Sequence, residues 1–289
     1  MPSNPFSVTS EFIQELNAPF SLTPEQIEFY RENGYIKLKH LLSPELLEHY
    51  RCAIAAAVTQ LSAGTLPLEQ RTSVIDRAFL QIMNLWTKFD EVKQFVFGKR
   101  LARVAAELMG VSGVRLYHDQ ALYKEPGGGI TPWHADQYYW PVSNNNIITA
   151  WVPLQETPPE LGPLTFCEKS QHLQFGRDVA VSDKSELTLT DALEAFSKDE
   201  TGYEFGDVSF HAGWTFHRAG ANATERPREV MTMIYMDEDI KLIEPINEHQ
   251  IHDRESWCPG VEVGETVASA LNPVLYSTVD DVRSTVSGS

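Results

Sequence analysis

The feature that most constrains the fold is a change of sequence pattern at Gly110. Before this glycine, apolar residues recur at helical spacing; after it, short runs rich in β-branched and aromatic residues alternate with Gly, Pro, Asn and Asp. The predicted strands cover residues 35–38, 114–124, 147–154, 163–167, 203–210 and 230–237. We therefore predict an α+β protein with a double-stranded β-helix core of jelly-roll or cupin-like type, and with the N-terminal helices packed on one sheet.

Capping residues mark the predicted helices. Thr23-Pro-Glu-Gln26 has the form of a capping box with proline at the first helical position, and Asn33-Gly34 ends that helix. Ser43 opens a second helix, whose interior at 46–58 carries apolar residues at helical spacing. Further helical patterns cover 74–85 and 90–109, and a polar, helix-compatible insertion at 190–198 interrupts the strands.

The length of 289 residues suits one large domain. We expect an N-terminal extension at 1–21 and a single domain at 22–283. Within that domain, we expect a helical part at about 22–110, a jelly-roll part at about 111–240 and a C-terminal extension at about 241–283. The small, polar residues 284–289 predict a disordered tail.

The charge balance limits the partners. A formal charge of -17 repels nucleic acid and anionic membrane surfaces, so we expect a small-molecule substrate instead. The sequence shows no secretory signal and no apolar run long enough to span a membrane, which predicts a cytoplasmic protein. Cys52, Cys167 and Cys258 are too scattered for a zinc-thiolate or disulfide framework. The sequence does not indicate an oligomeric state.

The segment 130–140, ITPWHADQYYW, contains the first candidate metal ligands. Side chains two residues apart in a strand point to the same face, so His134 and Asp136 have the spacing to bind one ion. The same pair also fits a polar strand exit or an Asx-type turn. In a chain of this composition, about half a His-x-Asp match is expected by chance, so the pair alone is weak evidence for a metal site.

A second candidate segment lies downstream, with His211, His217 and Arg228. Either histidine would complete a triad of two histidines and one carboxylate. Such a triad leaves three coordination positions open and suits iron(II) better than a closed zinc site. Arg228 begins the apolar run 228–237, and an arginine inside a jelly roll requires a bidentate carboxylate partner.

Large aromatic residues surround these candidates. Trp133, Tyr138, Tyr139, Trp140 and Trp214 fit either the filling of the barrel or the apolar wall of a substrate pocket. Arg218 fits either an exposed strand position or a contact to an anionic substrate.

Other polar residues are assigned structural positions. We predict that His118 is structural or part of a pocket wall, that Lys124 is a solvated loop lysine, and that Asp207 shapes a turn. The remaining histidines are predicted to lie on the surface or in the core: His40, His49, His172, His249 and His252.

Together these segments resemble the phytanoyl-CoA dioxygenase family of iron(II)- and 2-oxoglutarate-dependent oxygenases. The family pattern of His-x-Asp, a distal histidine and an arginine eleven residues later matches His134, Asp136, His217 and Arg228. The resemblance extends over 22–238 and includes the stretches LTPEQIEFYRENGYIKL at 22–38, TAWVPL at 149–154 and LGPLTF at 161–166. Two departures are Ala135, where many relatives carry glutamine, and EKSQH at 168–172, so the pocket walls do not carry over.

The resemblance implies the roles of further residues. Arg228 is expected to bind the distal carboxylate of 2-oxoglutarate, with Gln120, Trp151 and Gln81 as further contacts to this co-substrate. The implied activity is hydroxylation, or another oxidation, of an unactivated C–H bond with O2, giving succinate and CO2. The carboxylate of Asp136 disfavours halogenation, because related halogenases lack it. A cupin-like metal hydrolase or isomerase, or a non-catalytic binding protein, is the alternative. Acyl-CoA, a secondary metabolite and an amino-acid derivative all stay open as substrates.

Overall fold

The computed structural model describes residues 10–279, in which two antiparallel β-sheets face each other. The main sheet has the order β1-β8-β5-β10-β3-β11, and β2 also pairs with β3. Its strands are β1 (Tyr35–Leu38), β2 (Leu80–Met83), β3 (Gly113–Lys124), β5 (Ile147–Pro153), β8 (Val208–Ala212), β10 (Arg228–Asp237) and β11 (Val274–Ser277). The second sheet has the order β4-β9-β6-β7. Its strands are β4 (Thr131–His134), β6 (Leu164–Cys167), β7 (Lys198–Asp199) and β9 (His217–Ala219).

Strand β10 shows how the main sheet divides its side chains between two environments. Met231, Met233 and Tyr235 belong to the large apolar core shared with the helices. Thr232 and Ile234 alternate with them and line a cavity on the other face, as strand geometry requires. Because both faces are covered, every residue of β10 except Asp237 is buried.

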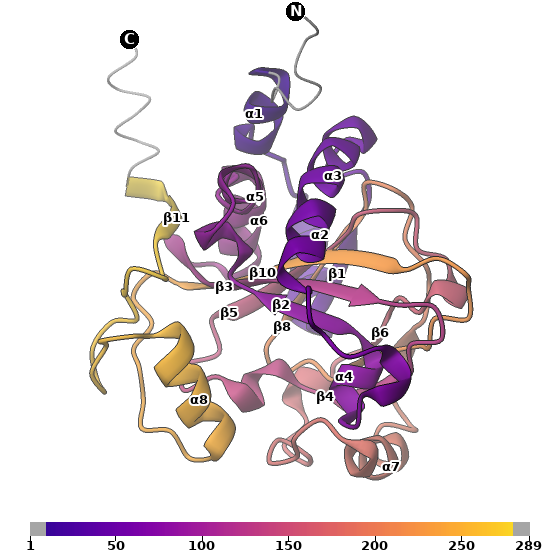
Figure 1. The fold of residues 1–289 in the computed structure, drawn as a ribbon. Helices are drawn as coiled ribbons and strands as arrows, with labels where there is room; N and C mark the ends of the chain where they lie inside the picture. Colours follow the sequence, from indigo (N-terminus) through magenta and orange to yellow (C-terminus); the bar gives the residue numbers. More distant parts are fainter. Residues whose placement is uncertain (1–9, 280–289) are drawn as a thin grey trace, which may run out of the picture.

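Helices cover the outer face of the main sheet (Figure 1). They are α1 (Ser10–Asn17), α2 (Pro24–Asn33), α3 (Pro44–Leu61), α5 (Asp90–Val96) and α6 (Lys99–Met109). The predicted capping box of α2 is confirmed, because the Thr23 Oγ1 accepts a hydrogen bond from the Gln26 backbone N–H at 3.3 Å. Gly34 ends α2 with a φ of 81°, a conformation that glycine adopts without strain. Helix α1 was not predicted.

The prediction of one helix at 74–85 was wrong in its second half. Helix α4 (Val74–Ala78) is followed by β2, which pairs with β3. The residues Leu-Gln-Ile-Met of β2 have no strong strand propensity, so pairing with β3 decides their conformation. The predicted helix at 90–109 is interrupted at Gly98, and the insertion forms α7 (Asp183–Ala192) instead of a helix at 190–198.

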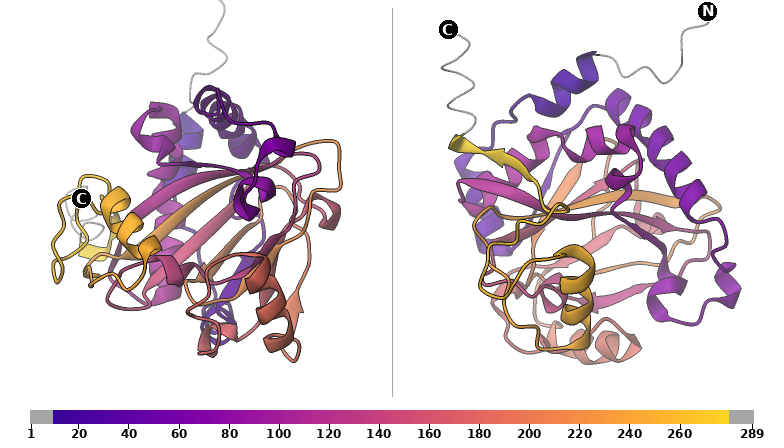
Figure 2. Two further views of the ribbon diagram at one scale, coloured as in Figure 1. Left: turned by 60° about the horizontal axis from the view of Figure 1, so that its bottom comes forward. Right: turned by 60° about the vertical axis from the view of Figure 1, so that its left-hand side comes forward.

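The C-terminal part returns to the main sheet from its other side. Helix α8 (Glu248–Trp257) lies on the opposite side of the main sheet from α2 and α3 (Figures 1 and 2). Strand β11 then pairs with the start of β3. No helix within 10–279 combines the length and the apolar character needed to cross a bilayer. The predicted disordered tail at 284–289 lies outside the described residues.

Candidate active site

Two strands and a turn bring three candidate ligands together. His134 at the end of β4 is the register partner of His217 at the start of β9. Asp136 lies just beyond β4, in the 3-10 helix η3 (Asp136–Tyr139). Asp136 Oδ1 lies 3.7 Å from the Nε2 atoms of both histidines. One ligand atom from each of the three residues fits within 4.8 Å of the others.

The sequence argument for this convergence was partly wrong. It placed His134 and Asp136 in one strand with parallel side chains, but β4 ends at His134. The chain leaves the strand at Ala135, and this exit turns the carboxylate back toward both imidazoles. The polar strand exit and the candidate ligand pair are therefore the same feature.

Backbone carbonyl groups fix the orientation of both imidazoles. His134 Nδ1 lies 2.7 Å from Pro132 O, and His217 Nδ1 lies 3.0 Å from Thr215 O. Each Nδ1 therefore carries the proton, which leaves the Nε2 lone pair directed at Asp136. Burial lowers the pKa of both histidines to about 4. Near neutral pH both rings are uncharged, as metal ligation requires.

Two neighbouring strands hold the carboxylate of Asp136. Thr149 of β5 and His211 of β8 are register partners, and both reach Asp136 Oδ2. The Thr149 hydroxyl donates at 2.9 Å, and His211 Nε2 lies at 3.1 Å. Burial by itself would raise the pKa of Asp136, but His217, His211 and His134 outweigh it and hold that pKa well below its usual range. Of the two rival histidines, His211 orients the carboxylate and His217 faces the ligand position.

The donor set fits a divalent transition metal. Two neutral imidazole nitrogens and one ionised carboxylate oxygen surround one possible metal position. All three residues line a cavity, which leaves room for further ligands of the metal. This combination with open positions is characteristic of non-haem iron(II) sites.

The cavity has a volume of about 440 Å³ and lies between the two sheets. Besides the three candidate ligands, its lining includes six of the predicted co-substrate and substrate contacts: Gln81, Gln120, Trp151, Arg228, Tyr139 and Trp140. The structure therefore brings both the expected co-substrate contacts and part of the aromatic set into one space.

Arg228 is the polar anchor at one end of the cavity. It is 1% exposed, yet its one hydrogen bond among the described residues runs from Nη1 to the carbonyl of Gly162 at 2.6 Å. Its Nε and the indole Nε1 of Trp151 have no partner among the described residues. Burial lowers the pKa of Arg228 to about 10, so the group is still charged at neutral pH. A buried guanidinium without a counter-ion indicates a site for a carboxylate ligand.

Gly162 is placed by backbone geometry. Its φ is 72°, and a Cβ at this position would collide with the carbonyl oxygen of Gly220. Only glycine brings the two backbones this close. The carbonyl that accepts from Arg228 is therefore fixed by the turn.

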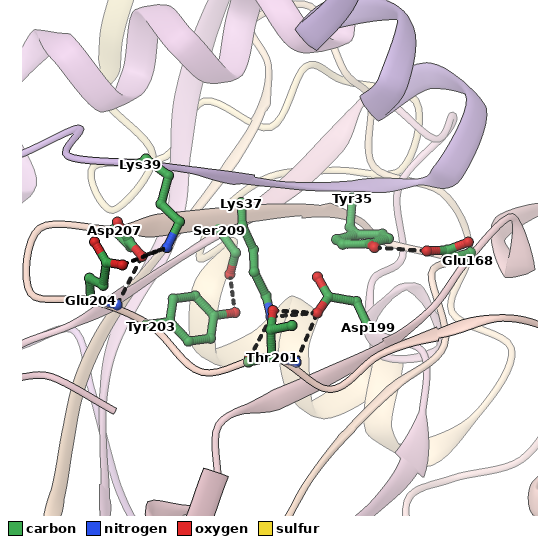
Figure 3. A network of polar contacts seen from close by, with 10 residues as sticks. All are labelled: Tyr35, Lys37, Lys39, Glu168, Asp199, Thr201, Tyr203, Glu204, Asp207 and Ser209. Atoms are coloured by element: carbon green, nitrogen blue, oxygen red, sulfur yellow. Dashed lines mark hydrogen bonds and ion pairs between the residues drawn. The ribbon is translucent and has the colours of Figure 1, made fainter. Parts of the chain in front are cut away.

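A polar network that includes Lys37, Asp199 and Tyr203 (Figure 3) reaches Trp151 through the ring of Tyr203. The ring of Tyr203 lies 4.7 Å from that of Trp151, and the Tyr203 hydroxyl donates to Ser209 Oγ at 2.9 Å. Lys37 Nζ lies 4.6 Å from the centre of the Tyr203 ring and pairs with Asp199 Oδ1 at 3.0 Å. The network joins β1 of the main sheet to β7 of the second sheet beside the Arg228 end of the cavity.

Gln120 and Gln81 face the cavity from neighbouring strands. Gln81 Nε2 donates to Gln120 Oε1 at 2.5 Å. In the register of the main sheet, Thr232 of β10 lies between Gln120 and Trp151. The expected co-substrate contacts thus come from three adjacent strands and β2.

Four residues of the predicted substrate set lie elsewhere among the described residues. Trp133 is buried in a separate apolar cluster, and the Arg218 guanidinium stacks over it at 4.9 Å while pairing with Glu186. Trp214 donates to the Asn145 side chain. Tyr138 packs edge-on against Tyr139. These four residues, Trp133, Tyr138, Trp214 and Arg218, are not among those that line the cavity.

The prediction that Lys124 is a solvated loop residue was wrong. Its side chain is fully buried and donates to the carbonyls of Gly129 and Gly220 at 2.6 and 2.8 Å. It connects the loop after β3 with the segment after β9. Burial first, and then the nearby charge of Arg228, lowers the pKa of Lys124 to about 6.

Sequence reasoning missed a wall of the cavity formed by α8. His249, His252, Asp253 and Trp257 line it, and His118 lies opposite on β3. His249 and His252 were predicted as ordinary surface or core residues. Together with Asp253 and Trp257 they occupy positions i, i+3, i+4 and i+8, which share one helical face. That periodicity was the available signal.

Comparison with known proteins identifies the family of this chain. The family model for phytanoyl-CoA dioxygenase matches residues 30–230. The chain is 22% identical over 227 residues to a probable alpha-ketoglutarate-dependent hypophosphite dioxygenase from Stutzerimonas stutzeri, covering 74% of this chain and 79% of that protein. It is 23% identical over 220 residues to a methylphosphonate hydroxylase from Gimesia maris, covering 74% and 81%.

A solved structure supports the fold. The epimerase SnoN, in complex with Fe³⁺, alpha ketoglutarate and nogalamycin RO, superposes with a TM-score of 0.70 at 23% identity, covering 87% of this chain and 98% of that chain. The predicted jelly-roll fold is confirmed. Because the family model spans well over half of the sequence, the chain belongs to the phytanoyl-CoA dioxygenase family of iron(II)- and 2-oxoglutarate-dependent dioxygenases.

Proposed function

We propose that His134, Asp136 and His217 hold the iron, and that Arg228 binds the distal carboxylate of 2-oxoglutarate in the same cavity. The observation that carries this assignment is the combination of three convergent ligand atoms with a buried, unpaired guanidinium. When bound, iron(II) with 2-oxoglutarate and O2 supplies the oxidising power for C–H oxidation, with succinate and CO2 as co-products.

The protein residues position the reactants. Pro132 O and Thr215 O hold the imidazoles in the ligating tautomer, and Thr149 and His211 hold Asp136. Gln120 and the indole N–H of Trp151 offer further hydrogen bonds beside Arg228. Arg228, Trp151 and His217 are buried between the two sheets, which strengthens their polar contacts.

The cavity favours a compact organic substrate. Its 440 Å³ lies in the lower part of the range of about 300–1,000 Å³ that ligand sites occupy, and it also has to hold 2-oxoglutarate. The two curated relatives act, by name, on hypophosphite and methylphosphonate, which are small molecules too. We therefore propose oxidation of a C–H bond in a small molecule of similar compactness.

Succinate formation tests the proposal. Purified protein with 2-oxoglutarate and O2 is expected to release succinate only after iron(II) is added, and a slow release is expected even without the true substrate. Asp136→Ala is expected to lose iron binding and succinate release together. Succinate release at the wild-type rate by Asp136→Ala would contradict the assignment. A metal-loaded wild type that never consumes 2-oxoglutarate would support a hydrolase or isomerase instead.

A further inference from the structure

The end of the cavity away from Arg228 has a composition of its own. Asp253 and Trp257 of α8 line it, with Trp140 after η3 and His118 of β3. None of these residues is needed to hold the iron or 2-oxoglutarate in the proposed function. This part of the cavity, the α8 end, is therefore free to contact the substrate.

Asp253 is a buried carboxylate without a cationic partner. It is 8% exposed, and the Tyr117 hydroxyl donates a hydrogen bond to its Oδ2 at 3.1 Å. No lysine or arginine pairs with it within 10–279. The adjacent Arg254 turns away and pairs with Glu262 at 3.6 Å. Burial of an ionised carboxylate is costly, and the cost is relieved either by protonation or by a ligand that supplies the opposite charge.

Aromatic rings surround this carboxylate. Trp140 is 4% exposed, and its ring lies 5.9 Å from that of Tyr117, which donates to Asp253. The ring of Trp257 lies 5.3 Å from that of His118, and its indole also interacts with the Asp253 carboxylate by a side-chain hydrogen bond. Indole rings beside a carboxylate are a combination that recognises organic cations.

The charge distribution of the cavity points the same way. Arg228 is the one arginine or lysine among the described residues that line it, and it lies at the opposite end beside Trp151. The protein as a whole carries a formal charge of -17, which attracts cations and repels anions at long range. Among the described residues, an anionic substrate would meet no lysine or arginine at the α8 end, only the imidazoles of His118, His249 and His252.

We propose that the α8 end binds the ammonium group of a small amine substrate, with Asp253 as counter-ion and Trp140 and Trp257 as the flanking rings. This inference rests on the proposed function, because it treats the α8 end as the substrate part of the same cavity. It adds a substrate class and a residue that selects it.

The protonation of Asp253 sets the conditions of the test. Burial raises the pKa of Asp253 to about 7, with a smaller contribution of the same sign from Asp136. The groups that face it are the Tyr117 hydroxyl, the Trp257 indole and the Cys258 thiol. At pH 8 the carboxylate is ionised and an aliphatic amine is protonated, so attraction between the two is at its strongest.

Three ligands of one shape and different charge provide the probe. Binding of cyclohexylmethylamine, cyclohexylmethanol and cyclohexanecarboxylate is measured by calorimetry at pH 8. The full chain is loaded anaerobically with iron(II) and 2-oxoglutarate, so that Arg228 is already occupied. The amine is expected to bind at least ~10-fold more tightly than the alcohol, as a hydrogen bond to a charged group gives, and the carboxylate is expected to bind most weakly. Equal or tighter binding of the alcohol or the carboxylate would overturn the proposal.

A pair of variants on α8 assigns the effect to one residue. Asp253→Asn keeps an oxygen that accepts from Tyr117, and it is expected to abolish the preference for the amine. Glu255→Gln removes one exposed negative charge from the same helix and is expected to keep the preference. If Asp253→Asn retains the full preference, the proposed counter-ion is wrong. Should Asp253→Asn fail to fold, the comparison of the three ligands on the wild type still decides.

The two proposals fail in different ways. The titrations are repeated on protein without iron and 2-oxoglutarate. Preference for the amine under both conditions supports the α8 end even if no 2-oxoglutarate binds, which would contradict only the proposed function. Binding of 2-oxoglutarate with no preference for the amine contradicts only the inference about Asp253.

Discussion

Replacing Arg228 with methionine is expected to have opposite effects on the free protein and on its complex with 2-oxoglutarate. In the free protein, the residue is 1% exposed, and within 10–279 its guanidinium makes one hydrogen bond, to Gly162. Loss of that bond costs about 1–3 kcal/mol, whereas removal of an uncompensated buried charge returns several kcal/mol. Arg228→Met without ligand is therefore expected to be at least as stable as the wild type.

The complex is expected to lose most of its affinity. Truncating one member of a buried, hydrogen-bonded charge pair costs about 2–5 kcal/mol, which raises the Kd for 2-oxoglutarate about 30-fold to several thousand-fold. At a concentration 100 times the wild-type Kd, 2-oxoglutarate stabilises the wild type by about 2.7 kcal/mol. The same concentration stabilises the variant by less than about 1 kcal/mol.

Thermal unfolding with iron(II) under anaerobic conditions measures both effects. The wild-type Tm is expected to rise by about 4–5 °C with 2-oxoglutarate, and the variant's Tm by no more than about 2 °C. Arg226→Met is the matched control, because Arg226 is exposed and lies outside the cavity lining. A wild-type response to 2-oxoglutarate in Arg228→Met, or an equal loss in Arg226→Met, would refute the reasoning.

Three further substitutions test how the site is held. Thr149→Val removes the hydroxyl that binds Asp136 and is expected to weaken iron binding about 10–100-fold in a metal titration; unchanged affinity would exclude the orienting role. Lys124→Met leaves two carbonyls unpaired and is expected to lower the free energy of unfolding by about 2 kcal/mol in urea, against no change if the lysine is dispensable. Gly162→Ala is expected to lose at least about 1 kcal/mol more than Gly127→Ala, since both glycines have positive φ but only Gly162 meets a backbone; equal losses would contradict the close approach.

The parts of the fold that local chemistry decides were predictable. The capping box at Thr23 and the β-branched run of β10 appear where the sequence placed them, because capping and strand propensity act within a few residues. Strand β2 was not predictable in this way. Its residues suit a helix equally well, and only the free edge of β3 next to Gln120 and Tyr123 determines their conformation.

The site shows the same division. The spacing of His134, Asp136, His217 and Arg228 was readable because the family pattern fixes those intervals. Trp133 packs in the apolar cluster with Leu189 of α7, whereas Tyr139 faces the cavity, and this difference depends on where β4 ends and η3 turns the chain. The burial of Lys124 likewise depends on its hydrogen bonds to the carbonyls of Gly129 and Gly220. Gly220 lies far away in the sequence, so no local pattern predicts this contact.

Helix α8 follows the segment matched by the family model, yet it completes the cavity. The iron ligands and Arg228 belong to interlocked strands, where any shift would disturb many neighbours at once. The helix is attached to them by loops and lines only one end of the cavity. A chimera that exchanges residues 241–279 for those of a relative should therefore change its substrate specificity, while the iron ligands and Arg228 keep their positions.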